Sequence, residues 1–165
     1  QLEIYEGDLK VSISAKNRVE MARNLNNPKR WNIVLKKFPK LKLNLAHFGG
    51  YETWSSSASV DIDIDPQQRK NCIIDFMSKY ENVYADFAYN IEDSGISENL
   101  KNLIVYKQDV RSKTLFGSDY WVVNKNIDLK KEQSRFLDKL DEDVNLEIWI
   151  AKELTLNNPK KYLFG

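Results

Sequence analysis

The stretch KTLFGSDYW, residues 113–121, decides the fold, because it is an apolar run that predicts a buried strand and then ends in a glycine and a single carboxylate, Asp119. A charge at the end of a buried strand is costly unless a partner balances it. A second stretch, LKLNLAHFGG at residues 41–50, has the same form and contains the only histidine of the chain, His47. Two metal-binding side-chain types therefore stand at equivalent places in two units, which predicts one site built at strand ends.

The composition limits the class of protein. The chain has 165 residues, of which 42% are apolar and 30% charged, enough for one core and a single domain over residues 1–165. Its 25 basic and 24 acidic residues give a formal charge of +1, so we expect neither nucleic acid nor a membrane as a partner. The absence of a spanning stretch or a secretion signal in the sequence favours a cytoplasmic location. The single cysteine, Cys72, is expected to be a small core residue.

The first of three helix–strand units follows residues 1–26, which we expect to be an irregular lead-in with one short element. Asn27 predicts a helix cap and Pro28 the first helical position, and apolar residues then recur at helical spacing until Pro39. The buried side of this helix would carry Trp31, Val34, Leu35 and Phe38. A strand over about residues 41–47 completes the unit.

The next two units repeat this order up to residue 121. Asp65 and Pro66 predict the start of a second helix, whose buried side would carry Ile73, Phe76, Met77 and Tyr80, before a strand over 83–88. A third helix from about Ser97, with Leu100, Leu103, Ile104 and Lys107 on its buried side, precedes a strand over 114–119. Residues 122–165 read as helices only, the last turn starting at Asn158 and Pro159. Alternating helices and strands predict an α/β fold with about three parallel strands.

Six segments carry a resemblance to a known family. They are NPKRW at 27–31, FP at 38–39, LAHFGG at 45–50, NVYAD at 82–86, LFGSDY at 115–120 and NPKKYLFG at 158–165. In order and spacing they resemble the C-terminal half of the amidohydrolase-2 family, metal-dependent hydrolases and decarboxylases of the amidohydrolase superfamily. The resemblance implies a partial TIM (β/α) barrel whose three strands are the sixth to the eighth of the family barrel.

The resemblance also implies roles for the strand-end residues. Asp119 looks like the eighth-strand aspartate, which binds the metal or accepts a proton from the attacking water, and His47 like the sixth-strand histidine, which ligates the metal or orients that water. Both are thus expected as catalytic and metal-binding residues, with zinc, or alternatively manganese, as the metal. Asp86 matches the seventh-strand segment, either as a substrate contact or as a hydrogen-bond acceptor behind a ligand. Trp54, Tyr120 and Trp121 are the other candidates for a pocket that takes a small-molecule substrate.

The ligand set of this chain is smaller than that of the family. The His-x-His of the first strand and the histidine of the fifth strand are absent, because His47 is the only histidine. A catalytic zinc takes about three protein ligands, so we expect this chain by itself to bind metal weakly. It would be either a fragment whose N-terminal half carries the missing strands, which the lack of a methionine at Gln1 favours, or a degenerate relative. Exposed strand edges would then be covered by a partner half, by self-association or by an added local element.

The same residues allow plainer interpretations. Next to two glycines, His47 can be a hydrogen-bonded turn residue, and Asp119 can cap the segment that follows it. The alternative function is a catalytically silent partial barrel that serves as an interaction or scaffold module. A flavodoxin-like nucleotide binder is disfavoured, because no glycine-rich loop joins a strand to a helix with phosphate-binding spacing.

Overall fold

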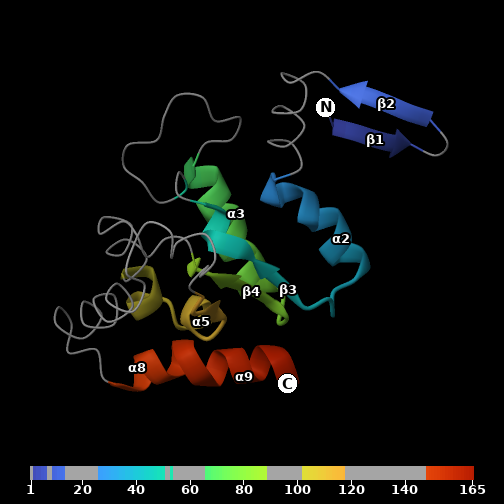
Figure 1. Ribbon diagram of the computed structural model, residues 1–165. Coiled ribbons are helices and arrows are strands. Elements are labelled where there is room, and N and C mark those ends of the chain that lie inside the picture. Colours follow the sequence, from blue (N-terminus) through green and yellow to red (C-terminus); the bar gives the residue numbers. More distant parts are fainter. Residues whose placement is uncertain are drawn as a thin grey trace, which may run out of the picture.

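The computed structural model describes residues 2–6, 9–13, 26–50, 53, 66–88, 102–117 and 148–165 (Figure 1). The elements in chain order are β1 (Leu2–Glu6), β2 (Leu9–Ile13), η1 (Pro28–Arg30), α2 (Trp31–Lys37), β3 (Leu43–Leu45), η2 (Ala46–Gly49), α3 (Pro66–Lys79), β4 (Val83–Asp86), α5 (Gln108–Arg111), β5 (Thr114–Leu115), α8 (Ile148–Lys152), η5 (Glu153–Asn157) and α9 (Asn158–Phe164). Residues 102–106 are also helical. Among these residues no helix has the length and apolar character that crossing a bilayer requires.

A parallel sheet in the order β3-β4-β5 is the centre of the structure, which confirms the predicted α/β class with three parallel strands. Leu45 lies opposite Ala85, and Asp86 lies opposite Leu115. In the view of Figure 1, α3 lies above the sheet and the C-terminal helix below it. The carboxyl ends of β3, β4 and β5 therefore share one edge, where the sequence predicts a site.

The two faces of the sheet differ in chemistry, because successive side chains of a strand point to opposite faces. One face, which we call the apolar face, carries Leu43, Leu45, Val83, Ala85 and Thr114. Its four apolar residues belong to the same buried cluster as Leu35, Ile73 and Met77 of the helices. The opposite face, which we call the polar face, carries Asn44, Tyr84, Asp86 and Leu115. The ring of Tyr84 packs edge-on against Tyr162 of α9, with centroids 4.9 Å apart.

The helix starts follow the predicted signals. Asn27 accepts a hydrogen bond from the backbone N–H of Lys29, 3.0 Å away, and Pro28 follows it as the first helical residue. Pro66 likewise begins α3, whose buried side carries the predicted Ile73, Phe76 and Met77, with Tyr80 just past its end. The sequence could predict these helix starts because the residues that determine them, a cap and a proline, interact only with the first turn of their own helix.

The predicted buried side of the first helix was wrong in part. Leu35 is fully buried, but Trp31 is 37% exposed and Phe38 54% exposed. The α-helical part spans only Trp31–Lys37, so a single buried side chain meets the core. Phe38 has left helical geometry (φ −128°, ψ 70°) before Pro39, as predicted for the helix end.

Three further elements differ from the predictions. β1 and β2 pair antiparallel, with Leu2 opposite Ile13, where one short element was predicted within an irregular lead-in. The third helix is divided, because Lys107 is extended (φ −120°, ψ 95°) and exposed between the helical residues 102–106 and α5. The strands are shorter than predicted: β3 ends at Leu45, where the 3-10 turn η2 begins, and β5 ends at Leu115, while residues 118–119 of the predicted strand lie outside the described residues.

The C-terminal helix is continuous from α8 through η5 to α9 (Figure 1), so Asn158 and Pro159 do not start a separate turn. Its middle, η5, is a π-helical turn in which the N–H of Asn158 donates to the carbonyl of Glu153. The carbonyl of Leu154 would then pair with residue 159, but a proline has no N–H. This carbonyl instead accepts from the N–H of Phe116, 3.2 Å away. Pro159 therefore frees a helix carbonyl for the sheet.

The same helix covers the outer edge of β5. The N–H of Ala85 donates to the carbonyl of Lys113, which turns the backbone groups of Thr114 and Phe116 away from β4. Asn158 Nδ2 donates to the carbonyl of Thr114 at 2.8 Å, and Phe116 donates to the helix carbonyl just described. The edge of β5 is thus hydrogen-bonded by an element of the same chain.

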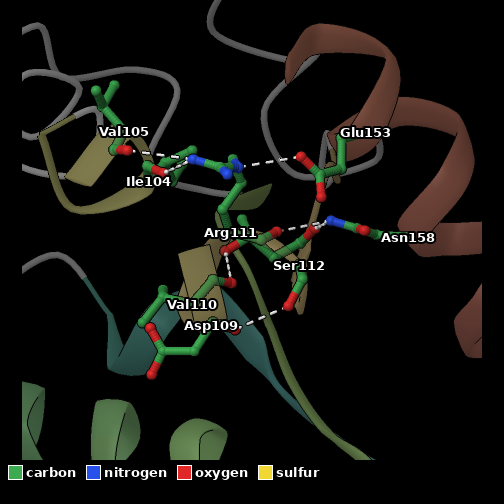
Figure 2. A network of polar contacts seen from close by, with 9 residues as sticks. Ile104, Val105, Asp109, Val110, Arg111, Ser112, Glu153 and Asn158 are labelled. Carbon is green, nitrogen blue, oxygen red and sulfur yellow. Dashed lines mark hydrogen bonds and ion pairs between the residues drawn. The ribbon is translucent and has the colours of Figure 1, made fainter. Parts of the chain in front are cut away.

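Arg111 fixes this helix to the rest of the fold (Figure 2). Its Nε donates to Glu153 Oε2 at 3.1 Å, and its Nη1 donates to the carbonyls of Ile104 and Val105 at 3.3 and 3.1 Å. The guanidinium carbon lies 4.7 Å from the ring centroid of Trp149. One side chain therefore joins residues 102–106, α5 and the C-terminal helix.

We predict that Asn158→Ala destabilises the protein, because it leaves the carbonyls of Arg111 and Thr114 without the amide that donates to them at 2.7 and 2.8 Å. The expected loss in urea unfolding is about 2–4 kcal/mol, the cost of leaving two mostly buried acceptors unpaired. The matched control is Asn157→Ala, one residue earlier and exposed, which should change the free energy of unfolding by less than about 0.5 kcal/mol. Equal effects of the two substitutions would contradict this role of Asn158.

Candidate functional site

The chain makes a left-handed turn directly after β3. His47 and Phe48 have φ values of 56° and 47°, and Gly49 and Gly50 follow with 85° and 93°. The left-handed region costs a non-glycine residue about 1–2 kcal/mol. Two successive residues in this strained conformation require stabilising contacts from the surrounding structure.

Several contacts hold this turn. The Phe48 side chain is fully buried in the core, and the N–H of Gly50 donates to the carbonyl of His47 at 2.9 Å. Thr53 Oγ1 and Arg69 Nη1 both donate to the carbonyl of Gly49 at 2.9 Å. The turn is thus fixed from the core and from α3, and it places His47 at the carboxyl edge of the sheet.

Asp86, at the end of β4, is the acceptor around which the site is built. Its Oδ1 accepts from the N–H groups of His47 and Ala88 at 3.0 and 3.1 Å, and its Oδ2 accepts from Asn44 Nδ2 at 2.5 Å. The residue is only 9% exposed, so these bonds replace the water that its charge would otherwise need. The carboxylate therefore ties β3, the turn and β4 to one another.

The imidazole of His47 lies beside the same carboxylate. Its Nδ1 is 3.8 Å from Asp86 Oδ1, and its side chain is 37% exposed while that of Asp86 is 13% exposed. A half-exposed imidazole backed by a buried carboxylate is the arrangement in which a histidine serves as a metal ligand or as an acid–base group.

Sequence reasoning brought His47 and Asp86 to one site, and the structure places them in contact. For Asp86 the geometry favours the acceptor role over a substrate contact, because the chain itself occupies its oxygens. The other candidates, Asp119, Trp54, Tyr120 and Trp121, lie outside the described residues. Within the described ranges, no group of three or more His, Cys, Asp and Glu side chains is placed to hold a metal ion.

Asn44 is the residue that sequence reasoning missed. It is the one polar residue inside LNL, the three residues of β3, and alternation puts its side chain on the polar face with Asp86. Its Oδ1 is buried without a hydrogen-bond partner, while its Nδ2 donates to the carboxylate. A lone asparagine inside an apolar strand was the available signal.

Burial changes the titration of two further groups, the Tyr84 hydroxyl of β4 and the Cys72 thiol of α3. Burial raises the pKa of the Tyr84 hydroxyl, with smaller contributions from Glu81 and Tyr162 in the same direction. Burial also raises the pKa of the Cys72 thiol, which is half-buried against the core as a small apolar residue would be.

No family model, no curated protein and no solved structure matches the chain. The assignment of a function therefore depends on the strand-end geometry.

We predict that Asp86→Ala destabilises the protein by about 2–4 kcal/mol, because three donors lose their common acceptor. The amide of His47 should also exchange with solvent much faster, which hydrogen exchange followed by NMR would measure. Asp86→Asn is the matched control, since it keeps the shape and one acceptor oxygen and should lose less stability. Unchanged exchange at His47 in Asp86→Ala would show that the carboxylate does not hold the turn.

Gly49→Ala should destabilise the protein by about 1–3 kcal/mol, the usual cost of one strained backbone position. Gly49 has φ +85°, and an added Cβ would lie 2.7 Å from Ile73 Cδ1 and 3.0 Å from Arg69 Cδ. Thermal unfolding would measure the loss. Gly117→Ala is the comparison, because its added Cβ would lie 3.0 Å from Ala88 Cβ without a positive φ. A larger loss for Gly117→Ala would contradict the strained turn.

Proposed function

We propose that the chain contributes one rim of the active site of a metal-dependent hydrolase of the amidohydrolase superfamily. The observation that carries this proposal is the contact between His47, in its left-handed turn, and the buried carboxylate of Asp86 at the strand ends. Enzymes with parallel α/β sheets place their reactive groups at the carboxyl ends of strands. Strained backbone also gathers at functional sites.

The identity of residue 47 supports a functional role. A turn with φ near 56° is most easily made by glycine, and Gly49 and Gly50 make the rest of it. A histidine there has a conformational cost that glycine would avoid. Its imidazole is half-exposed at the sheet edge, where a ligand or substrate would approach.

Asp86 would act as the positioning residue behind His47. A metal-binding histidine usually donates its second ring N–H to a carboxylate, which fixes the ring and its tautomer. Nδ1 lies 3.8 Å from Asp86 Oδ1, longer than a hydrogen bond, so the ring would move closer to the carboxylate on binding and Nε2 would be the metal-binding atom. Asn44, which donates to the other oxygen of Asp86, would orient that carboxylate.

The side chains at the strand ends are of the types that bind zinc and manganese, but the described residues supply fewer ligands than a catalytic zinc takes. Imidazole nitrogen and carboxylate oxygen suit zinc and manganese, yet a catalytic zinc takes about three protein ligands. We infer that Asp119, four residues beyond the end of β5, supplies a second ligand or a general base. When bound, the metal would supply Lewis-acid activation of water at neutral pH.

The further ligands would come from a companion half of the barrel, in this proposal. The outer edge of β5 is hydrogen-bonded to the C-terminal helix, so a companion strand would join at β3. The N–H of Leu43 donates to the carbonyl of Asn82, so the backbone of Asn44 faces the outer side of β3. Closure of a full (β/α) barrel at β5 would require the C-terminal helix to release that edge.

The substrate would be a small molecule with an amide, ester or lactone-like carbonyl, or a carboxylate that is lost by decarboxylation. His47 would polarise the reacting carbonyl or hold the metal, and Asp119 would hold the metal or accept the proton of the attacking water. Trp54, Tyr120 and Trp121 remain our proposed lining of the substrate pocket.

One observation favours the second candidate, a catalytically silent scaffold. The three hydrogen bonds to Asp86 come from its own chain, so the carboxylate can hold β3, the turn and β4 together without any metal. The two functions differ in whether His47 responds to a divalent ion.

Zinc titration of the whole chain tests the proposal, because His47 is the only histidine and its imidazole gives a single set of NMR signals. We expect zinc to shift these signals and to raise the melting temperature. His47→Gln should abolish the thermal shift, and Asp86→Asn should weaken binding about 10–100-fold, as loss of a carboxylate behind a ligand does.

Asp75→Asn is the matched control for the titration, because Asp75 is an exposed carboxylate of α3 and should leave zinc affinity unchanged. Imidazole signals that stay fixed at millimolar zinc, with an unchanged melting temperature, would refute the metal site and leave the scaffold function.

A further inference from the structure

A concave surface lies away from the strand ends, between η1–α2 and the second half of α3. This groove has a volume of about 660 Å³. Lys29 and Asn32 line it from one side and Cys72, Asp75 and Phe76 from the other. None of its lining residues belongs to the His47 turn or to β4, so it is a separate surface.

The floor of the groove is apolar. Phe76 is 7% exposed and belongs to the core cluster, and the half-buried Cys72 packs against the same cluster. Burial raises the pKa of the Cys72 thiol, so it is neutral at physiological pH and behaves as apolar surface. Pockets for small ligands have volumes of roughly 300–1,000 Å³ and combine apolar walls with a few polar groups.

The groove carries charges of both signs. Lys29 and Lys79 line it together with Asp75, and Asp109 accepts a hydrogen bond from Ser78 of the lining, so the two signs balance and a ligand anion would depend on one well-placed lysine. Lys29 Nζ is held at the groove by a 3.0 Å hydrogen bond to Gln68 Oε1. Lys79 Nζ instead lies 5.4 Å from the ring centroid of Tyr80. Lys29 is therefore the better-placed cation for a ligand.

We propose that this groove binds a small amphipathic anion, whose apolar body lies against Phe76 and Cys72 and whose single acidic group pairs with Lys29. Asn32 and Ser78, also in the lining, provide polar groups along the rim, and Ser78 Oγ already donates to Asp109, which leaves its oxygen as an acceptor.

Cys72 lines the groove and is the only thiol of the chain, so its rate of alkylation shows whether a ligand occupies the groove. The probe is anilinonaphthalene sulfonate, and N-phenylnaphthylamine is its uncharged counterpart with the same ring system. The rate of alkylation of Cys72 by N-ethylmaleimide is measured with and without each probe. We expect the sulfonate, at ten times its dissociation constant, to slow alkylation about tenfold by mass action. The uncharged compound should protect Cys72 less well.

Lys29→Gln tests the anion pairing and should weaken binding of the sulfonate about two- to fivefold, the usual value of an exposed ion pair. Lys37→Gln is the matched control, because Lys37 is an exposed lysine of α2 outside the groove and should change nothing. Melting curves of both variants would show whether the fold is intact.

Alkylation that is unaffected by the sulfonate would overturn the binding site. Equal protection by both probes, or equal affinity of the two variants, would overturn the anion pairing. No metal enters this test, so its outcome is independent of the proposed hydrolase site.

Discussion

The buried carboxylate of Asp86 is the constraint on which the site depends. It accepts hydrogen bonds from Asn44 of β3, from the backbone of the left-handed turn and from the residues just after β4. A buried carboxylate is tolerated only with such partners, so these three hydrogen bonds hold the strand ends and the turn in their positions. His47 is placed at the sheet edge as a consequence of this requirement.

The C-terminal helix imposes the second constraint, along the outer side of the edge strand β5. Pro159 creates a π-helical turn, the freed carbonyl of Leu154 pairs with Phe116, and Asn158 pairs with Thr114. Arg111 holds the same helix through its hydrogen bond to Glu153 (Figure 2) and through its contact with the ring of Trp149. The two edge strands therefore differ: the outer side of β5 is hydrogen-bonded by its own chain, and the outward backbone of β3 is where we propose that a companion strand adds.

Local features could be predicted from the sequence. The helix starts at Pro28 and Pro66, the buried side of α3 and the parallel α/β order followed from caps and periodicity. The left-handed φ of His47 and Phe48 could not be predicted, because it depends on Asp86, 39 positions away, and on burial of Phe48 in the core. The role of Asn158 was equally hidden, since its partners Arg111 and Thr114 are 47 and 44 positions away. For the site, sequence reasoning paired His47 with Asp119, which lies outside the described residues, and offered Asp86 only as an additional candidate. It overlooked Asn44, whose contact with Asp86 appears only once the strands are in register.

The most direct test of the central claim is NMR of the chain labelled with nitrogen-15 and loaded with cadmium as a substitute for zinc. The two nitrogens of the single imidazole give separate signals, and a scalar coupling to cadmium identifies the atom that binds the ion. Our account predicts coupling to Nε2 of His47, with Nδ1 protonated and facing Asp86. Coupling to Nδ1, or no coupling at either nitrogen with the fold intact, would contradict it.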